Sequence, residues 1–139
     1  MPIKLHLYFT RILMRLVGWL FFFLMVCFLG LAQPVKTPVT QNTGIASWYS
    51  DNFNGRRTAS GEIFSQKRLT CASNQYKIGT WLRVTNVKNG KSVVVKVNDR
   101  MSPRMKRIVD LSRAAAKQIG IIGSGLTKVS VEKLGNKQP

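Results

Sequence analysis

Acidic side chains are scarce in this chain of 139 residues, which holds 22 Lys and Arg but only 5 Asp and Glu. The formal net charge of +17 predicts a surface that attracts polyanions. So few carboxylates also confine any acid–base chemistry by Asp or Glu to a handful of positions. These positions are Asp51, Glu62, Asp99, Asp110 and Glu132.

Histidine and cysteine are nearly missing as well. The one histidine, His6, lies in the N-terminal segment, and the two cysteines are Cys27 and Cys71. Beyond that segment the chain therefore lacks the ligands of a zinc site, and we expect neither a metal nor another cofactor. One remaining thiol forms no intramolecular disulfide. Cys71 has small and apolar neighbours in "LTCAS", which favours a buried packing role over a nucleophile.

Long uncharged runs are confined to the N-terminus. Lys4, Arg11 and Arg15 precede the apolar run "LVGWLFFFLMVCFLGLA" of residues 16–32. A basic segment, an apolar stretch and small residues at its end predict a signal peptide over residues 1–32, and hence export to the periplasm or cell envelope. The alternative is an uncleaved anchor, because this run is at the short limit of a membrane-spanning helix. We expect contact with a membrane only through this N-terminal segment, and only if it is not cleaved.

The rest of the chain has room for one domain. Residues 33–43, "QPVKTPVTQNT", read as a Pro- and Thr-containing linker without periodicity. We expect the domain over residues 44–134 and a short tail over residues 135–139. After removal of the signal peptide, 19 basic and 5 acidic side chains leave a charge of +14.

Local patterns in this domain predict short strands and one helix. Alternation in "GTWLRVTNV" and "SVVVKVND" indicates two strands, and Asn89-Gly90 between them is typical of a hairpin turn. Ser112 is a candidate N-cap for a helix that Gly120 can end. Several short strands with one helix favour a small β-barrel. The predicted elements are strands near residues 44–50, 79–87, 92–99 and 126–134 and a helix within 111–120.

Elimination leaves Glu62 and Asp99 as the candidate carboxylates, and the residues alone single out neither. Asp51 lies in a polar turn, Glu132 alternates outward on the last strand, and Asp110 precedes the predicted helix as a candidate capping residue. Asp99 ends the valine strand, where burial favours the protonated form while the neighbouring Arg100 favours the ionised form. The residues alone leave a structural role open, in which Asp99 pairs with Arg100 or bonds the next turn.

Three blocks carry a resemblance to a known family. They are "GIASWYSDNFNGRRTASGEIF", "LTCASNQYKIGTWLRVTNVKNGKSVVVKVNDR" and "RIVDLSRAAAKQIG". In order and spacing they resemble the rare lipoprotein A family of septal lytic transglycosylases, over about residues 44–134. The resemblance implies a mainly β fold: a six-stranded double-psi β-barrel with one or two short helices, preceded here by a signal helix and linker.

The resemblance also implies a function and a set of site residues. The family cleaves the β-1,4 bond between N-acetylmuramic acid and N-acetylglucosamine in peptide-stripped peptidoglycan strands, leaving a 1,6-anhydro product. The expected partner is therefore a glycan strand, bound by a monomer without nucleic acid. The family's catalytic aspartate and active-site glutamate fall on Asp99 and Glu62. Residues expected to bind substrate are Ser73, Trp48, Tyr49, Arg100 and Arg104.

Two departures from the family pattern favour an alternative. Ser73 occupies the position of a histidine usual in the family, and "MSP" at residues 101–103 replaces the usual Gly-Pro after the catalytic aspartate. Serine can hydrogen-bond but does not titrate near neutral pH. The alternative is a catalytically weak or inactive, expansin-like peptidoglycan-binding module. The sequence leaves two roles open for the Trp48 side chain, packing in the core and stacking on a sugar ring. Nucleic-acid binding rests on charge alone, and export argues against it.

Overall fold

The computed structural model describes residues 13–19 and 40–139 of the chain. The predicted signal peptide and linker therefore lie largely outside the described residues. Residues 13–19 are helical and belong to a separate unit from Pro38–Pro139, so each unit is described by itself. Within the described ranges no helix has the length and apolar character needed to cross a membrane.

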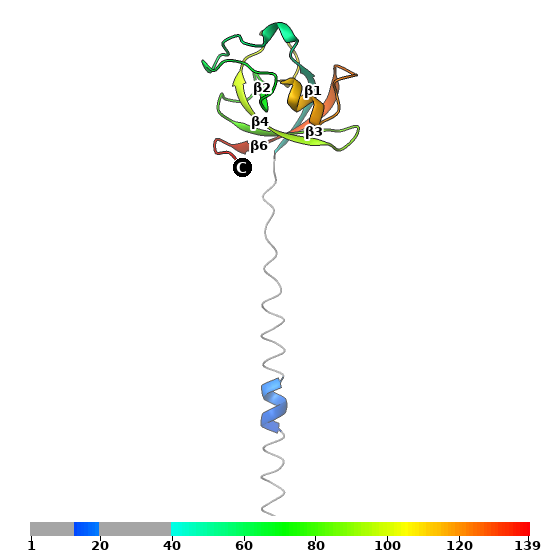
Figure 1. Cartoon of the computed structure of the whole chain (residues 1–139). Helices are drawn as coiled ribbons and strands as arrows, with labels where there is room; N and C mark the ends of the chain where they lie inside the picture. Colours follow the sequence, from blue (N-terminus) through cyan, green and yellow to red (C-terminus); the bar gives the residue numbers. More distant parts are fainter. Residues whose placement is uncertain (1–12, 20–39) are drawn as a thin grey trace, which may run out of the picture. The chain divides into compact units, whose positions relative to one another are not determined.

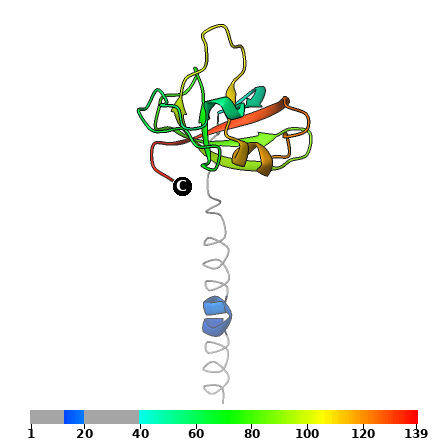
Figure 2. The same ribbon diagram turned by 45° about the horizontal axis from the view of Figure 1, so that its top comes forward.

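Residues 40–139 form a closed barrel of six strands in the order β1-β5-β2-β4-β3-β6 (Figures 1 and 2). Two neighbouring pairs, β1 with β5 and β2 with β4, are parallel, and the other four are antiparallel. This confirms the mainly β, six-stranded barrel that the resemblance implies. The elements are β1 (Gln41–Trp48), a 3-10 helix η1 (Asp51–Phe53), β2 (Thr70–Ala72), β3 (Trp81–Asn86), β4 (Ser92–Asp99), β5 (Val109–Leu111), α2 (Arg113–Gln118) and β6 (Thr127–Gly135).

Most of the predicted elements are confirmed, with two differences. β1 begins at Gln41, inside the segment expected to be a linker, because Gln41 to Thr43 pair with Glu132 to Ser130 of β6. The three-residue strands β2 and β5 were not predicted from local pattern. Each is held by long-range partners on both sides, so neither needs a local turn to form.

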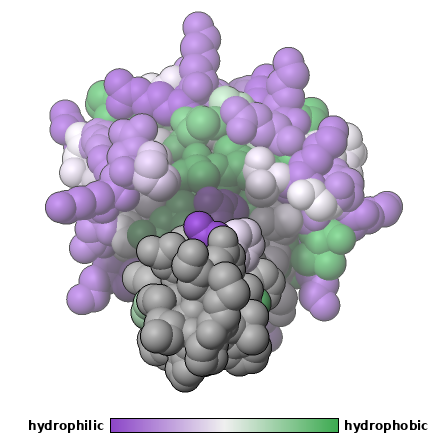
Figure 3. Space-filling view, turned by 90° about the horizontal axis from the view of Figure 1, so that it is seen from below, coloured by the Kyte–Doolittle hydropathy of each residue, from purple (hydrophilic) through white to green (hydrophobic). Residues whose placement is uncertain are grey.

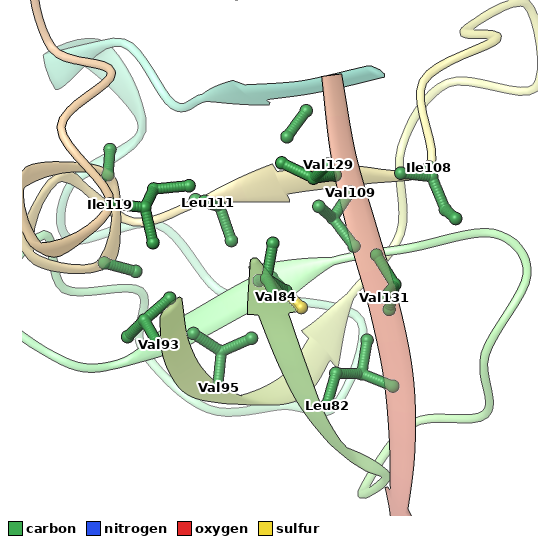
Figure 4. Packing of buried hydrophobic residues seen from close by; sticks show 14 of the residues in the cluster. Leu82, Val84, Val93, Val95, Ile108, Val109, Leu111, Ile119, Val129 and Val131 are labelled. Atoms are coloured by element: carbon green, nitrogen blue, oxygen red, sulfur yellow. The ribbon is translucent and has the colours of Figure 1, made fainter. Parts of the chain in front are cut away.

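Aliphatic side chains fill the barrel interior (Figure 4). The odd-numbered valines of β4 are buried, as their alternation predicts, and Figure 4 shows Val93 and Val95 in the same core as Val129 and Val131 of β6. Cys71 is fully buried in the same cluster, as expected, and burial raises the pKa of its thiol. A buried thiol with a raised pKa is a packing residue rather than a nucleophile.

The helix α2 is tied to the β3–β4 hairpin. The Ser112 side chain accepts a hydrogen bond from Ala115 N, and Gly120, with φ of 71°, follows the helix end. The side-chain amides of Asn86 and Asn89 both donate to the carbonyl of Ile119, at 2.9 and 3.1 Å. The predicted cap and stop of this helix are thereby confirmed, and the hairpin supplies two donors for the carbonyl of the C-cap residue, Ile119.

Candidate active site

A β-bulge at the end of β4 sets the direction of Asp99. The pairing of β2 with β4 shifts between Cys71 and Ala72, so that Cys71 lies opposite Val97 and Ala72 lies opposite Asp99. Val97 and Asn98 are consequently both buried, and Asp99 is half-buried. Without the shift, Asp99 would continue the inward face of the odd-numbered valines. Bulges commonly redirect side chains in this way beside active sites.

The Asp99 carboxylate accepts three hydrogen bonds. Ala59 N and Arg100 N donate to Oδ1 at 2.9 and 2.8 Å, and the Tyr49 hydroxyl donates to Oδ2 at 2.8 Å. The immediate surroundings of the carboxylate are thus donors from three segments rather than the valines of β4. Two of these donors are backbone amides, which hold the carboxylate in one orientation.

Tyr49 is positioned by an aromatic cluster just after β1. Its ring lies 4.4 Å from that of Phe64 and 5.5 Å from that of Phe53, measured between centroids. Burial, followed by the hydrogen bond to Asp99, raises the pKa of the Tyr49 hydroxyl well above its usual value of 10.0. The phenol therefore stays neutral and keeps its proton available to Asp99.

The loop between η1 and β2 folds over the end of β4. Ser60 N donates to Asn98 O at 3.0 Å, next to the bond between Ala59 N and Asp99. The same loop carries Glu62, whose Oε1 lies 3.0 Å from Lys96 Nζ and whose Oε2 accepts from Asn98 Nδ2 at 3.1 Å. The bonds to Asn98 and Lys96 lower the pKa of Glu62, so this carboxyl is ionised at neutral pH.

A groove of about 550 Å³ lies next to this loop, on the outside of the barrel. Glu62 lines it and Asp99 does not. Asp99 follows the groove residue Lys96 by three positions on β4, which is at most about 10 Å along a strand. The two candidate carboxylates therefore do not share this groove, but Asn98, adjacent to Asp99 and bonded to Glu62, connects them. The lining residues are Glu62, Arg68, Leu69, Thr70, Trp81, Arg83, Val94, Lys96, Gln138 and Pro139.

Ser73 was expected to bind substrate, but its side chain has an exposed fraction of 0%. Its hydroxyl donates to Ile108 O at 2.8 Å and accepts from Gln75 N at 3.2 Å. In this structure it fixes a loop, and it is not among the residues that line the groove beside Glu62. Arg100, also expected to bind substrate, donates from Nη1 to the carbonyls of Ser73 and Tyr76, the latter at 2.8 Å. It holds the same loop against the end of β4.

The other predicted residues occupy different surroundings. Trp48 packs partly against the core. The Arg113 guanidinium lies 5.1 Å from the centroid of the Trp48 ring and therefore covers one face of that ring. Arg104 is exposed in the loop between β4 and β5, which projects from the barrel (Figure 2). Asp110 does not cap α2; it accepts a hydrogen bond from Ser47 and lies 3.7 Å from Arg107.

Several site residues were not found by sequence reasoning. They are Asn98 and Lys96, which hold Glu62, and Trp81 of the groove. One signal was present: Lys96 interrupts the valines of "VVVKV" at an outward-facing position. Among the described residues, no group of three or more His, Cys, Asp or Glu is arranged to hold a metal ion.

Comparison with known families gives one match over most of the barrel. The family described as "Lytic transglycolase" matches residues 41–131. A probable endolytic peptidoglycan transglycosylase RlpA of Synechocystis is 51% identical over 89 residues, which is 64% of this chain and 28% of the relative. The endolytic peptidoglycan transglycosylase RlpA of Neisseria meningitidis serogroup A is 45% identical over 92 residues, 66% of this chain and 38% of the relative. This chain therefore matches well under half the length of these relatives.

Solved structures with a similar fold include a glycan-binding protein. An expansin of Clavibacter michiganensis has a TM-score of 0.57 at 25% identity, over 72% of this chain and 53% of the expansin. A mutant of a Clavibacter michiganensis expansin was solved in complex with cellohexaose. A Streptomyces papain inhibitor has a TM-score of 0.56 at 19% identity, over 70% of this chain and 98% of the inhibitor, which shows likeness of fold alone.

Proposed function

Because the chain belongs to the lytic transglycolase family, we propose that it is an endolytic peptidoglycan lytic transglycosylase of the cell envelope. Its substrate is a peptide-stripped glycan strand, cut between N-acetylmuramic acid and N-acetylglucosamine. The 6-hydroxyl of the muramic acid attacks its own anomeric carbon, the bond to the N-acetylglucosamine oxygen breaks, and a 1,6-anhydro end forms without water. The position of Asp99 supports this most directly: a half-buried carboxyl at the barrel edge, oriented by two backbone amides.

Asp99 is the one residue that exchanges protons in this scheme. It first protonates the departing oxygen of N-acetylglucosamine and then accepts the proton of the attacking 6-hydroxyl. One carboxyl suffices because no water needs activating, unlike in the two-carboxylate hydrolases. The Tyr49 hydroxyl suits both states, since it donates to the ionised carboxylate and can turn to accept from the protonated one.

Glu62 takes a different role. Its bonds to Asn98 and Lys96 keep it ionised at neutral pH, so it is no proton donor. A fixed negative charge stabilises the positive charge that develops on the sugar ring in the transition state. Asn98 connects Glu62 to the neighbouring Asp99, so the same loop and strand end orient both groups.

The test uses purified peptide-stripped strands and mass spectrometry of the products. Wild type should release strands with 1,6-anhydromuramyl ends, and Asp99→Asn should lose this activity by at least about a thousandfold, as expected when the proton-exchanging group is removed. Asparagine keeps the size of the side chain, its amide can donate to Tyr49, and its oxygen can still accept from Ala59 N. Asp51→Asn, which alters an exposed carboxylate paired with Arg113, is the matched control and should cleave normally.

Two results would contradict the proposal. An Asp99→Asn variant that cleaves as fast as wild type would remove Asp99 from the chemistry. Wild type that binds strands but never produces anhydro ends would instead identify a non-catalytic glycan-binding module with an expansin-like fold.

A further inference from the structure

The groove beside Glu62 is built on the outer face of three neighbouring strands. Thr70 of β2 and Trp81 of β3 both pair with Lys96 of β4, so the three side chains share one row on the same face. The next row places Arg83 of β3 opposite Val94 of β4. The groove thus combines an aromatic ring with several cations.

One cationic side chain of this groove is left without an ion-pair partner in the described ranges. Glu62 is the only acidic side chain among its lining residues, and it pairs with Lys96 at 3.0 Å. Arg83 is paired with Glu132 of β6 at 2.8 Å. Arg68 is exposed and takes part in none of the ion pairs found within the described residues. The groove therefore has a cation to offer to an anionic ligand.

A second feature of the groove points to a polar ligand. The side-chain oxygen of Thr70 is buried and has no hydrogen-bond partner in the part of the chain that the structure describes. Buried hydroxyls are normally bonded, and an unsatisfied one costs about 1–3 kcal/mol. A hydroxyl or amide of a ligand, or a water held by it, would supply the missing bond.

We propose that this groove binds a muramic acid residue by the carboxylate of its lactyl group, with Arg68 as the cation and Trp81 as the surface for a sugar ring. The inference rests on the proposed function and specifies its substrate. In a peptide-stripped strand the lactyl carboxylate is free, whereas in a peptide-bearing strand it is consumed in an amide bond. Arg68 therefore selects stripped strands, and Trp81 holds either kind.

The place of the groove agrees with this role. Asp99 follows Lys96 on β4 at a spacing of at most about 10 Å, so a strand cut at Asp99 continues into the groove. Glu62 lines the groove and is bonded to the residue next to Asp99, which places it between the two regions. Figure 3 shows hydrophilic side chains projecting around an apolar area on one face of the domain.

Binding is measured by titration calorimetry on the full chain carrying Asp99→Asn, which prevents cleavage. The ligands are stripped strands and the same strands with their lactyl carboxyls converted to methylamides. We expect the parent to bind the acid form about tenfold more tightly, as one charge-assisted hydrogen bond provides. Arg68→Gln should abolish this preference, and Arg68→Lys should retain part of it. Lys88→Gln removes an exposed charge from the β3–β4 turn and should change nothing.

The outcomes separate this inference from the proposed function. Three results would overturn the role of the groove, even if wild type makes anhydro ends. They are equal affinity of the parent for both ligands, no binding of either ligand, and an unchanged preference for the acid form in Arg68→Gln. A preference that depends on Arg68 supports the groove even if wild type cleaves nothing. Trp81→Ala should weaken the binding of both ligands by a similar factor. A loss of affinity confined to the acid form would overturn the role of the Trp81 ring.

Discussion

Tyr49→Phe removes one hydrogen bond and leaves almost everything else in place. The phenol donates to Asp99 Oδ2 at 2.8 Å, while the ring packs on Phe64 and Phe53. Phenylalanine keeps those ring contacts and opens no cavity. The change therefore isolates the bond between the buried hydroxyl and the carboxylate.

The size of the effect follows from the partner. A hydrogen bond to a charged group contributes about 1.5–3 kcal/mol, and Asp99 is half-buried, so water can replace the lost donor in part. We expect a loss near the lower end, about 1.5 kcal/mol, or roughly 6–12 °C in Tm for a domain of this size. If Tyr49 also assists Asp99 during proton exchange, kcat should fall about tenfold or more with little change in KM.

Urea unfolding and release of anhydro ends measure the two effects. The same substitution in an Asp99→Asn background is the control, because there the bond joins two neutral groups and its loss should cost less. An equal cost in both backgrounds would refute the reasoning, since Tyr49 would then act by packing alone. So would a Tyr49→Phe variant with wild-type stability and kcat.

The remaining predictions concern pH and packing. The pKa of Glu62 is lowered from its ordinary value of 4.5, so its ionised form stabilises the folded state. Wild type should therefore have a higher Tm than Glu62→Gln above pH 4.5, and this difference in Tm should shrink as the pH falls below 4.5. A difference in Tm that stays constant with pH would contradict this. Burial raises the pKa of Asp110 above its ordinary value of 3.8, so ionising this carboxyl costs stability in the folded state. In thermal melts from about pH 3 to 7, the Tm of wild type should fall relative to that of Asp110→Asn as the pH rises above 3.8. At higher pH the difference between the two Tm values should stay constant. Gly44→Ala would place a Cβ 2.8 Å from that of Ile108 and should cost about 1–3 kcal/mol in urea unfolding, whereas Gly123→Ala meets nothing within 4 Å and should cost far less.

The predictable parts of this fold are those specified by neighbours in sequence. The alternation of β4, the Asn89-Gly90 turn and the cap of α2 by Ser112 are local features, and each appears as predicted. The strands β2 and β5 have three residues each, too few to show alternation. They exist because distant strands flank them, which no window of the sequence reveals.

The candidate site divides in the same way. Glu62 and Asp99 were assigned from the family resemblance, and residue patterns alone left a structural role for Asp99 open. The bulge that turns Asp99 off the core face depends on a register between β2 and β4. Its partner Tyr49 comes from 50 residues away. A register shift and a long-range hydrogen bond leave no periodic trace, so the orientation of the carboxylate required the structure.

Ser73 marks a departure from the family pattern, and its surroundings favour a role in fixing a loop. It stands where the family usually has a histidine, and it was expected to touch substrate, yet it is buried and bonded to Ile108 O and Gln75 N. Ser73→Ala should therefore cost about 0.5–1.5 kcal/mol of stability by urea unfolding, with kcat and KM for stripped strands unchanged. A rise in KM without a loss of stability would mean that Ser73 turns outward to the glycan, and its assignment as a loop-fixing residue would be wrong.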